Sequence, residues 1–523
     1  MTLLGDGDDG EIVGEREHET AFRSGRRARS STPSPMHRQV RYRFAYRSYR
    51  FEVSKRGALH RPPSHPQHGV GGSMPLSRLS PLAVALALST LPAAAQEAGS
   101  RDARGRLDFE GRFLVSVQDA DMLASAYVDG ALGPREGRDT LAVIALDGDP
   151  RDWRAVEVFA SNSVAGPPAA VDVSADGRFA YVVETFTPRP DDDEPHAFGD
   201  LSIGSTLTVV SLEDAAAPEV LQTLQVGRRP LAVDVHPSGR LIAVSYSIEG
   251  GSGGETPLQL FRVGEDGTLS DPVSPTIAGY ALGEDNIMDM DWHPDGEVMV
   301  WVNQFSNTMQ FARVAAELTV EPFGNTVDIE RAPYRVLFTP DGRHAVANAL
   351  YWGPDIAGAW IEAPRGQVLT VRMNAEQRAD GSVRHAFVDR VMTGVSPEGL
   401  AVSPDGRWVA TTNLERSYLP YDDARMTWFS SITLATLDQE TGDLAVVGAF
   451  AYDGILPEAA QFDNSGEYLA VANYDHFDDR RAGSSIDFWR IQSDPLDPGN
   501  TQLIKTEHSV PVARGAHSMA IVR

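Results

Sequence analysis

Charged side chains recur at one position of a repeated segment, where they could act together on water. Glu398 and Glu458 each lie eight residues before a glycine, and His517 aligns with them near the C-terminus. Asp289 and Arg335 lie one residue further along their own copies. A carboxylate or a neutral imidazole can take a proton from water, and a guanidinium can stabilise a developing oxyanion. Glu398, Glu458 or His517 is therefore predicted as the general base, and Arg335 as the electrophilic group.

Side-chain amides recur after the same glycines. Asn303, Asn413 and Asn473 follow their glycines by seven residues, and Asn348 follows its own by six. With Asp289 they are predicted to complete a ring of polar groups around a ligand pocket. A structural role stays open, because Asn at a strand end commonly caps a turn and Glu before a strand can accept backbone N–H bonds.

Two long segments follow these asparagines and are rich in charged and aromatic residues. The first, residues 413–425, contains Glu415, Arg416, Tyr418 and Arg425. The second, residues 473–481, contains Asp475 and His476. Loops often carry function, so both are predicted to bind an anionic or polyhydroxylated ligand. The alternative is a pair of solvated loops whose charges form salt bridges with their neighbours.

The elements that position these residues are six copies of one hairpin. The copies read PAAVDVSADGRFAYVVE, PLAVDVHPSGRLIAVSY, IMDMDWHPDGEVMVWVN, PYRVLFTPDGRHAVANA, PEGLAVSPDGRWVATTN and PEAAQFDNSGEYLAVAN. The turn glycines are Gly177, Gly239, Gly296, Gly342, Gly406 and Gly466. A glycine turn between two short apolar runs predicts a β-hairpin, and its recurrence every 46 to 64 residues indicates an array of similar units.

Each unit is predicted to be a four-stranded propeller blade. Two further strands follow most hairpins, for example 205–212 with 220–224 and 431–437 with 444–450. Residues 516–522 match an inner strand, and 111–117 begin like a second strand. The last strand would then complete the N-terminal blade, whose outer strands are 140–146 and 155–159, and remove the open sheet edge. The expected fold is all-β, a seven-bladed β-propeller over residues 108–523. A β-solenoid or tandem sandwiches are the alternatives.

In such a ring the inner strands start at the face where the second strands end. The charged residues and the asparagines are therefore expected at one mouth of the central channel. The repeat, best seen in PEGLAVSPDGRWVATTN from Pro397, resembles the bacterial seven-bladed lactonase-like propellers. These are the 6-phosphogluconolactonase type and its periplasmic relatives with YVTN-type repeats. The resemblance implies lactone hydrolysis at the channel mouth, although a fold does not determine an activity.

A secretory signal peptide is predicted over residues 74–95. It has Arg78, an apolar stretch over 79–91 and Ala93-Ala-Ala95, so cleavage would leave Gln96 first. The apolar stretch is too short for an ordinary membrane span. Residues 1–73 are interpreted as a leader from a misplaced start, with a disordered basic tail as the alternative, and 96–107 as a linker. The chain is expected to be periplasmic or secreted.

Charge and composition exclude several classes of function. Residues 1–95 hold 14 of the 46 lysines and arginines and 8 of the 73 acidic residues, so the remainder carries a net charge of −33. Such a surface disfavours nucleic-acid binding. The absence of cysteine excludes disulfides, thiol catalysis and thiolate metal sites. The partners expected are a small-molecule ligand at the channel mouth and no membrane, with the chain a monomer.

No cofactor is expected. The acidic run Asp191 to Glu194 with His196 offers oxygen ligands that suit Ca²⁺, but consecutive acids cannot all face one ion, and a solvated acidic loop is the preferred interpretation. No HExxH or P-loop motif is present. Two functions stay open: a hydrolase acting on a sugar or other lactone, and a non-catalytic propeller that binds a small ligand or a protein through the same face.

Overall fold

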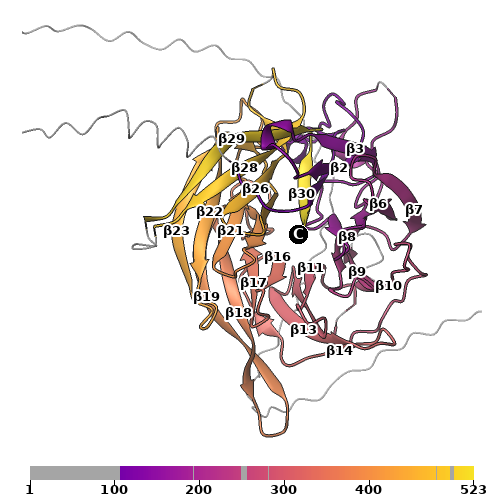
Figure 1. Cartoon of the computed structure of the whole chain (residues 1–523), viewed down its shortest axis with the longest axis vertical. Coiled ribbons are helices and arrows are strands. Elements are labelled where there is room, and N and C mark those ends of the chain that lie inside the picture. The colour runs from indigo at the N-terminus through magenta and orange to yellow at the C-terminus, as the bar shows by residue number, and fades with distance from the viewer. Residues whose placement is uncertain (1–106, 193, 249–255, 281, 479, 495–499) are drawn as a thin grey trace, which may run out of the picture. The chain divides into compact units, whose positions relative to one another are not determined.

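Seven antiparallel sheets stand like blades around one axis (Figure 1). The computed structural model describes residues 107–523 apart from 193, 249–255, 281, 479 and 495–499. The predicted all-β, seven-bladed propeller is confirmed. Helix is confined, in the described residues, to α2 (Ala126–Asp129) and two 3₁₀ turns, η1 (Pro150–Asp152) and η2 (Phe198–Asp200). None of the described helices is both long and apolar enough to cross a membrane.

The blades follow one another along the chain, each written here from its inner strand outward. Blade 1 is β30 (Ala516–Val522), β1 (Phe113–Gln118), β2 (Thr140–Ala145) and β3 (Ala155–Phe159); blade 2 is β4 (Val171–Val173), β5 (Phe179–Val183), β6 (Thr206–Ser211) and β7 (Glu219–Gln225). Blade 3 is β8 (Pro230–Val235), β9 (Leu241–Tyr246) and β10 (Leu258–Arg262), with Val273 bridging Leu260 in the fourth position. Blade 4 is β11 (Ile287–Trp292), β12 (Val298–Asn303), β13 (Thr308–Val314) and β14 (Val320–Pro322), with β15 (Val327–Asp328) also on β13.

The last three blades have longer outer strands. Blade 5 is β16 (Pro333–Phe338), β17 (His344–Ala349), β18 (Arg365–Gln377) and β19 (Val383–Val395); blade 6 is β20 (Pro397–Val402), β21 (Trp408–Asn413), β22 (Ser430–Leu437) and β23 (Leu444–Tyr452). Blade 7 is β25 (Ala459–Phe462), β26 (Tyr468–Asn473), β28 (Ser484–Gln492) and β29 (Gln502–Val512). A separate two-stranded pair joins β24 (Gly454–Ile455) to β27 (Asp475–His476).

The ring closes as the sequence predicts. The inner strand β30 lies antiparallel to β1, with Val117 opposite Ser518 and Phe113 opposite Val522. Strands from the two ends of the described chain therefore share one sheet, and Figure 1 shows yellow β30 beside the indigo strands of blade 1. Because the ring is closed, every blade has a neighbour on both sides, and the exposed edge of an open array is removed.

The repeated glycines take the conformation that their hairpin turns require. All six have φ between 67° and 77°, in the left-handed region that side chains disfavour. Each donates its N–H to the carbonyl three residues earlier, at 2.7–3.2 Å. At Gly342 a Cβ atom would also lie only 2.0 Å from Nε2 of His293 in the preceding blade. These contacts confirm the hairpin prediction and explain why the turn keeps glycine.

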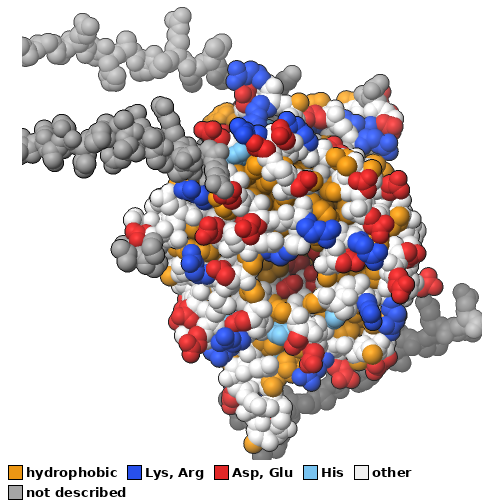
Figure 2. Space-filling model, viewed as in Figure 1, with side chains coloured by type: hydrophobic (Ala, Val, Ile, Leu, Met, Phe, Trp, Pro, Cys, Tyr) orange, Lys and Arg blue, Asp and Glu red, His pale blue; other side chains and the backbone are white. Residues whose placement is uncertain are grey.

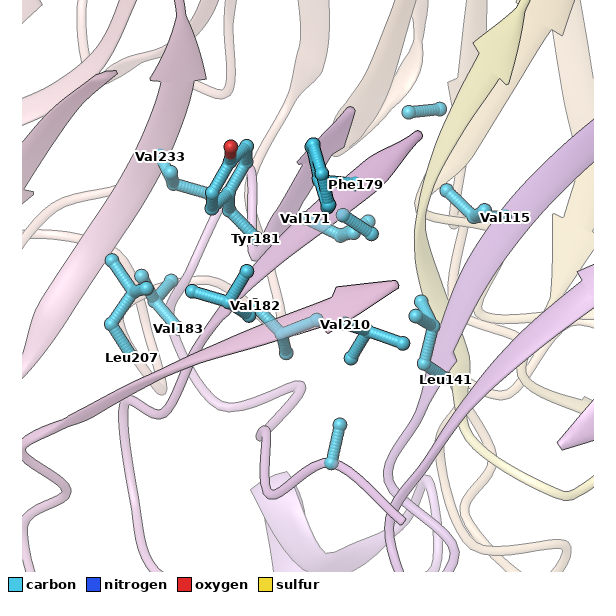
Figure 3. Packing of buried hydrophobic residues seen from close by; sticks show 14 of the residues in the cluster. Val115, Leu141, Val171, Phe179, Tyr181, Val182, Val183, Leu207, Val210 and Val233 are labelled. Carbon is cyan, nitrogen blue, oxygen red and sulfur yellow. The ribbon is translucent and has the colours of Figure 1, made fainter. Parts of the chain in front are cut away.

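Apolar side chains fill the spaces between neighbouring blades. Figure 3 shows Val115 and Leu141 of blade 1 facing Phe179, Val182 and Val210 of blade 2. All five are buried. Burying aliphatic and aromatic surface of this kind stabilises a fold by roughly 25 cal/mol per Å². The blades therefore hold one another in place through side-chain packing as well as through ring closure.

A carboxylate repeated in three inner strands adds a polar link between blades. Asp172, Asp234 and Asp291 each lie five residues before a turn glycine, and each accepts the backbone N–H of a residue in the next blade. The donors are Val235 at 2.7 Å, Trp292 at 3.0 Å and Phe338 at 2.5 Å. These bonds tie blades 2 to 5 together close to the axis.

An apolar cap covers the face at which the inner strands start, called here the start face. It consists of the β1–β2 loop with α2, the β3–β4, β5–β6, β17–β18 and β21–β22 loops, and the segments around β24 and β27. Its buried members are Met122, Ala124, Ala126, Leu132, Val164, Ile361, Leu414, Tyr418, Leu419, Ile455, Leu456 and Tyr474. The residues predicted at the channel mouth therefore lie beneath a layer of packed side chains.

Candidate functional site

Glu398 and Glu458 come together beneath the cap. Glu398 lies in β20 and Glu458 just before β25, and each keeps only 5% of its surface exposed. Burial raises the pKa of Glu398 to about 8. Burial raises the pKa of Glu458 well above its ordinary value, and the charge of Glu398 raises it further. Two carboxyl groups that interact this way do not both ionise at neutral pH, so the site holds at least one proton.

Tyrosine hydroxyls surround the two glutamates. The hydroxyl of Tyr334 donates to the carbonyl of Pro167 at 3.5 Å and also interacts with the Glu398 carboxyl group, where it opposes the rise in the pKa of Glu398. Tyr127 of α2 and Tyr474 lie close enough to Glu458 for its charge to raise their pKa, although burial is the larger cause. All three therefore keep their protons at neutral pH, and the hydroxyl of Tyr474 already donates to the carbonyl of Met122 at 2.7 Å.

The position that carries Glu398 divides the start face into a polar and an apolar half. Tyr334, Glu398 and Glu458 each lie eight residues before a turn glycine, in blades 5, 6 and 7, and His517 aligns with them in blade 1. The same position in blades 2, 3 and 4 is occupied by Ala169, Leu231 and Met288, all buried. Tyr334 was not predicted as a site residue, yet the same alignment that identified the glutamates contains it.

Arg335 and Asp289 form an ion pair across two blades. Nε of Arg335 donates to Oδ2 of Asp289 at 2.8 Å, and Nη1 donates to the carbonyl of Pro168, in blade 2, at 2.7 Å. The backbone N–H of Val336 also donates to Oδ2 of Asp289. Burial raises the pKa of Asp289, and Arg335 opposes that shift. The guanidinium predicted as an oxyanion anchor is thus already bound to a carboxylate and a carbonyl.

His517 makes its hydrogen bond away from the glutamates. Its Nε2 lies 2.8 Å from Oδ1 of Asn162. Burial lowers the pKa of His517 to about 3, so the ring is neutral at ordinary pH. Its Nδ1 is buried and has no hydrogen-bond partner in the described part of the chain. A neutral imidazole with one free nitrogen keeps the capacity to accept a proton, but nothing places it against Glu398.

The four asparagines predicted as ligands bond to protein atoms. Asn348 joins blade 5 to blade 6, because its Oδ1 accepts the N–H of Arg335 and its Nδ2 donates to the carbonyls of Pro397 and Glu398. Asn303, Asn413 and Asn473 donate mainly to side chains of their own blades. These contacts correspond to the structural role that stayed open for asparagine at this position.

The segment over residues 413–425 anchors the cap. Arg416 donates to the carbonyls of Ile361 at 2.8 Å and Ala363 at 3.3 Å, and Tyr418 is buried in the apolar cluster. Glu415 accepts the hydroxyl of Ser431 at 2.7 Å. Arg425 pairs with Asp423 and Glu362 near the surface. These side chains therefore contact neighbouring segments of the protein, and ligand binding by them stays a prediction.

The segment over residues 473–481 borders a surface cavity. His476 lines it, while Oδ1 of Asp475 accepts the backbone N–H of His476 at 2.7 Å. The cavity has a volume of about 340 Å³, and its lining is Asp453, His476, Phe477, Asp478, Arg480 and Arg481. Exposed aromatic rings stand beside it: Trp428 stacks on Tyr421 at 5.2 Å and lies 5.5 Å from Phe477.

The acidic run considered for Ca²⁺ is occupied by protein cations. Asp191 pairs with Arg135 at 2.5 Å, and Asp192 lies 2.7 Å from Nε2 of His196. Asp193 lies outside the described residues. Asp191 and Asp192 thus pair with an arginine and a histidine of the protein.

The inner-strand carboxylates Asp172, Asp234 and Asp291 form a second acidic group near the axis. Each keeps part of its surface exposed while protein encloses the rest, and Figure 2 shows acidic side chains recessed at the centre of the ring. Burial raises the pKa of Asp172 to about 6 and that of Asp291 to about 8, and burial also raises that of Asp234. The sequence signal for them is an Asp five residues before the glycine in three successive copies.

This acidic group makes stability depend on pH. A carboxyl group whose folded pKa lies above its unfolded value, near 3.9, stabilises the fold while protonated, and that contribution is lost as pH rises toward the folded pKa. We therefore expect the urea midpoint to fall between pH 5 and pH 8. Asp291→Asn keeps an acceptor for the N–H of Phe338 and should make this decline less steep, because unfolding then releases about one proton fewer. Asp152→Asn, at an exposed position, should leave the profile unchanged. An identical decline in wild type and Asp291→Asn would contradict the assignment.

Comparisons with solved structures identify the same fold. A candidate 6-phosphogluconolactonase from Bacteroides uniformis is 17% identical, with a TM-score of 0.52 over 79% of this chain and 100% of the other. A second candidate 6-phosphogluconolactonase, from Bacteroides fragilis, is 17% identical, with a TM-score of 0.50 over 80% and 99%. A hypothetical selenium-binding protein from Sulfolobus tokodaii is 11% identical, with a TM-score of 0.50 over 79% and 94%.

No protein-family model and no curated protein matches the chain. At these identities the similarities show the fold alone. The chain thus has the fold of the lactonase-like propellers, as its repeat predicts. Proteins described in such different terms share this fold, so the fold alone does not determine a function.

Proposed function

We propose that the chain hydrolyses a lactone, using Glu398 and Glu458 beneath the cap. The observation that carries the proposal is the meeting of two buried carboxyl groups of raised pKa within a set of tyrosine hydroxyls. When two neighbouring carboxyl groups carry only one negative charge between them, the ionised group can act as a base and the protonated group as an acid. Structural neighbours named as candidate lactonases are consistent with this reaction.

The roles follow from the two pKa shifts. Ionised Glu398, whose pKa is about 8, takes a proton from water while the water oxygen bonds to the lactone carbonyl carbon. The carbonyl oxygen becomes an oxyanion, which the hydroxyl of Tyr334 stabilises by donating a hydrogen bond. The bond from that carbon to the ring oxygen then breaks, and protonated Glu458 gives its proton to the ring oxygen. The product is the open hydroxy acid. Substrate reaches this centre when the cap loops move apart.

A lactone panel tests the proposal. The full chain and the form that begins at Gln96 are incubated with neutral and phosphorylated aldonolactones and with aliphatic lactones, in the presence of EDTA or of Ca²⁺, and acid release is followed by pH-stat. Hydrolysis above the spontaneous rate for at least one class supports the proposal. Spontaneous rates across the whole panel reject it, and then the start face is a binding surface only.

A non-catalytic binding function is the second candidate, and the exposed aromatic side chains of Tyr421 and Trp428 favour it. Trp428 keeps 60% of its surface exposed and Tyr421 keeps 51%, beside a cavity that presents Arg480 and Arg481. Exposed aromatic groups next to arginine are typical of recognition surfaces. A polyhydroxylated acid fits both features, and quenching of tryptophan fluorescence by sugar acids, abolished in Trp428→Ala, would support this function. Unchanged fluorescence with every sugar acid would exclude it for this ligand class.

Export to the periplasm or the medium belongs to the same proposal. Residues 74–95, which carry the predicted signal peptide, and residues 1–73 and 96–106 lie outside the described part of the chain. N-terminal sequencing of exported protein is expected to begin at or near Gln96. A mature product that retains residues 1–73 would reject both the signal peptide and the interpretation of the leader.

A further inference from the structure

Three buried aspartates converge at the base of the β1–β2 loop. Asp119 and Asp121 follow β1, and Asp139 directly precedes β2, so the group spans both ends of the loop that carries α2 into the cap. Their exposed fractions are 3%, 4% and 1%. One carboxylate oxygen from each residue lies within 4.8 Å of the others. Nothing in the proposed hydrolysis uses these residues.

Backbone groups orient all three carboxylates in the same way. Oδ2 of Asp119 accepts the N–H of Val164 at 3.0 Å, and Oδ2 of Asp121 accepts the N–H of Arg189 at 2.8 Å. Oδ2 of Asp139 accepts the N–H of Asn162 at 3.1 Å. One oxygen of each residue is thus anchored. Asp119 and Asp121 also interact with each other through their side chains.

An unpartnered oxygen indicates what that ligand is. Oδ1 of Asp139 is fully enclosed and accepts no hydrogen bond from any described residue. Leaving a buried acceptor unsatisfied costs about 1–3 kcal/mol, and more for a charged group. Neither Arg189 nor Arg514 bonds to this oxygen: Arg189 donates to the carbonyls of Asp121 and Gly133, Arg514 donates to Glu136 and the carbonyl of Pro134, and the Nε of each has no partner among the described residues.

We propose that Asp119, Asp121 and Asp139 bind a hard divalent cation such as Ca²⁺, which fastens the two ends of the β1–β2 loop. Ca²⁺ takes oxygen ligands at about 2.3–2.6 Å, so two oxygens on one ion lie at most about 5 Å apart. The 4.8 Å limit observed for the three oxygens meets this condition. The donor set contains only oxygen, which excludes a preference for soft metals. The remaining coordination positions are left to water or to backbone carbonyls.

The cation also resolves an electrostatic conflict. Burial raises the pKa of Asp119 to about 8, and Asp121 raises it further; burial raises that of Asp139 as well, with Asp119 contributing. Arg514 lowers the pKa of Asp119 by a smaller amount. Without a cation, neutral pH therefore requires either protonation or uncompensated buried charge. A bound divalent cation compensates the buried charge of the three carboxylates.

The test uses the full chain, freed of metal with EDTA and dialysed. Calorimetric titration with CaCl₂ at pH 8 should show one site per chain, and the thermal midpoint should rise with Ca²⁺. Mg²⁺ and Mn²⁺ are titrated in parallel, and binding of either at the same residues also supports the proposal. Asp139→Asn keeps an acceptor for the N–H of Asn162 and is expected to weaken binding at least tenfold. Asp191→Asn, in the exposed acidic run, is the matched control and should bind as wild type does.

Two readouts separate a cation site from a proton-sharing cluster. Without metal, Asp139→Asn removes a repelling charge, so its midpoint at pH 8 should equal or exceed that of metal-free wild type, which also shows that the variant folds. The metal-dependent rise should be lost. No heat and no midpoint shift with millimolar Ca²⁺, Mg²⁺ or Mn²⁺ would overturn the proposal, as would unchanged affinity in both Asp139→Asn and Asp119→Asn.

Discussion

Glu398→Gln is expected to lower lactone turnover by about 10²-fold or more while leaving the fold intact. The amide has the shape of the carboxyl group but cannot accept the proton of the attacking water. Because Glu398 is buried and its pKa is raised to about 8, removing its charge should not destabilise the protein. The measurement is initial rate against the best lactone of the panel, with the urea midpoint recorded for each variant.

The pH profile provides an independent check on Glu398. If its ionised form is the base, wild-type turnover should rise about tenfold per pH unit below pH 8 and then level off, because the pKa of the group is about 8. Glu297→Gln, an exposed residue beside the turn glycine of blade 4, is the control and should keep the wild-type rate. Full turnover in Glu398→Gln would remove it as the base.

Deletion of residues 516–523 is expected to prevent formation of a closed ring. The deletion removes β30, the inner strand of blade 1, and with it Ala516, Met519, Ala520 and Val522 from two apolar clusters. The inner edge of β1 then lacks its partner, and blade 7 loses its neighbour. We expect the thermal midpoint to fall by about 10 °C or more, or cooperative unfolding to disappear.

Restoring the strand as a separate peptide distinguishes ring closure from general damage. A synthetic peptide of residues 514–523 should bind the truncated chain and raise its midpoint, since β30 pairs with β1 over its whole length. Removal of Arg523 alone, which lies after β30, should have a much smaller effect. A truncated chain with the wild-type midpoint and unfolding slope would show that closure contributes little to stability.

The repeated pattern was sufficient to predict the fold. Every turn glycine takes positive φ, and Phe113–Gln118 pairs with the C-terminal strand in the expected orientation. Local chemistry explains this success, because a Pro/Asp/Ser-Gly turn between apolar runs specifies a hairpin wherever it occurs. The division of the start face into polar and apolar halves follows from the same alignment, once the residue eight positions before each glycine is compared across copies.

The cap and the aspartate group could not be predicted in this way. Met122, Leu132, Leu419 and Ile455 lie in loops with no regular spacing, so no periodic pattern reveals that they pack together. Loop residues such as Arg416 look like ligand groups in the sequence because a guanidinium bound to backbone carbonyls has no signature. The convergence of Asp119 with Asp139 depends on both ends of one loop returning to adjacent strands, which only the folded sheet reveals.

Because β1 pairs with β30, blade 1 can be completed only after the C-terminal strand has been translated. Val117 and its partner Ser518 are separated by about 400 residues, which a ribosome adds in roughly 20–80 s at ~5–20 residues per second. Until then blade 1 has three strands and an unpaired apolar edge, and the six other blades form an open arc with two exposed flanks. A nascent chain in this state can pair with a second copy of itself. Chaperone occupancy of β1 during that interval would protect the chain, and its release would coincide with arrival of the closing strand.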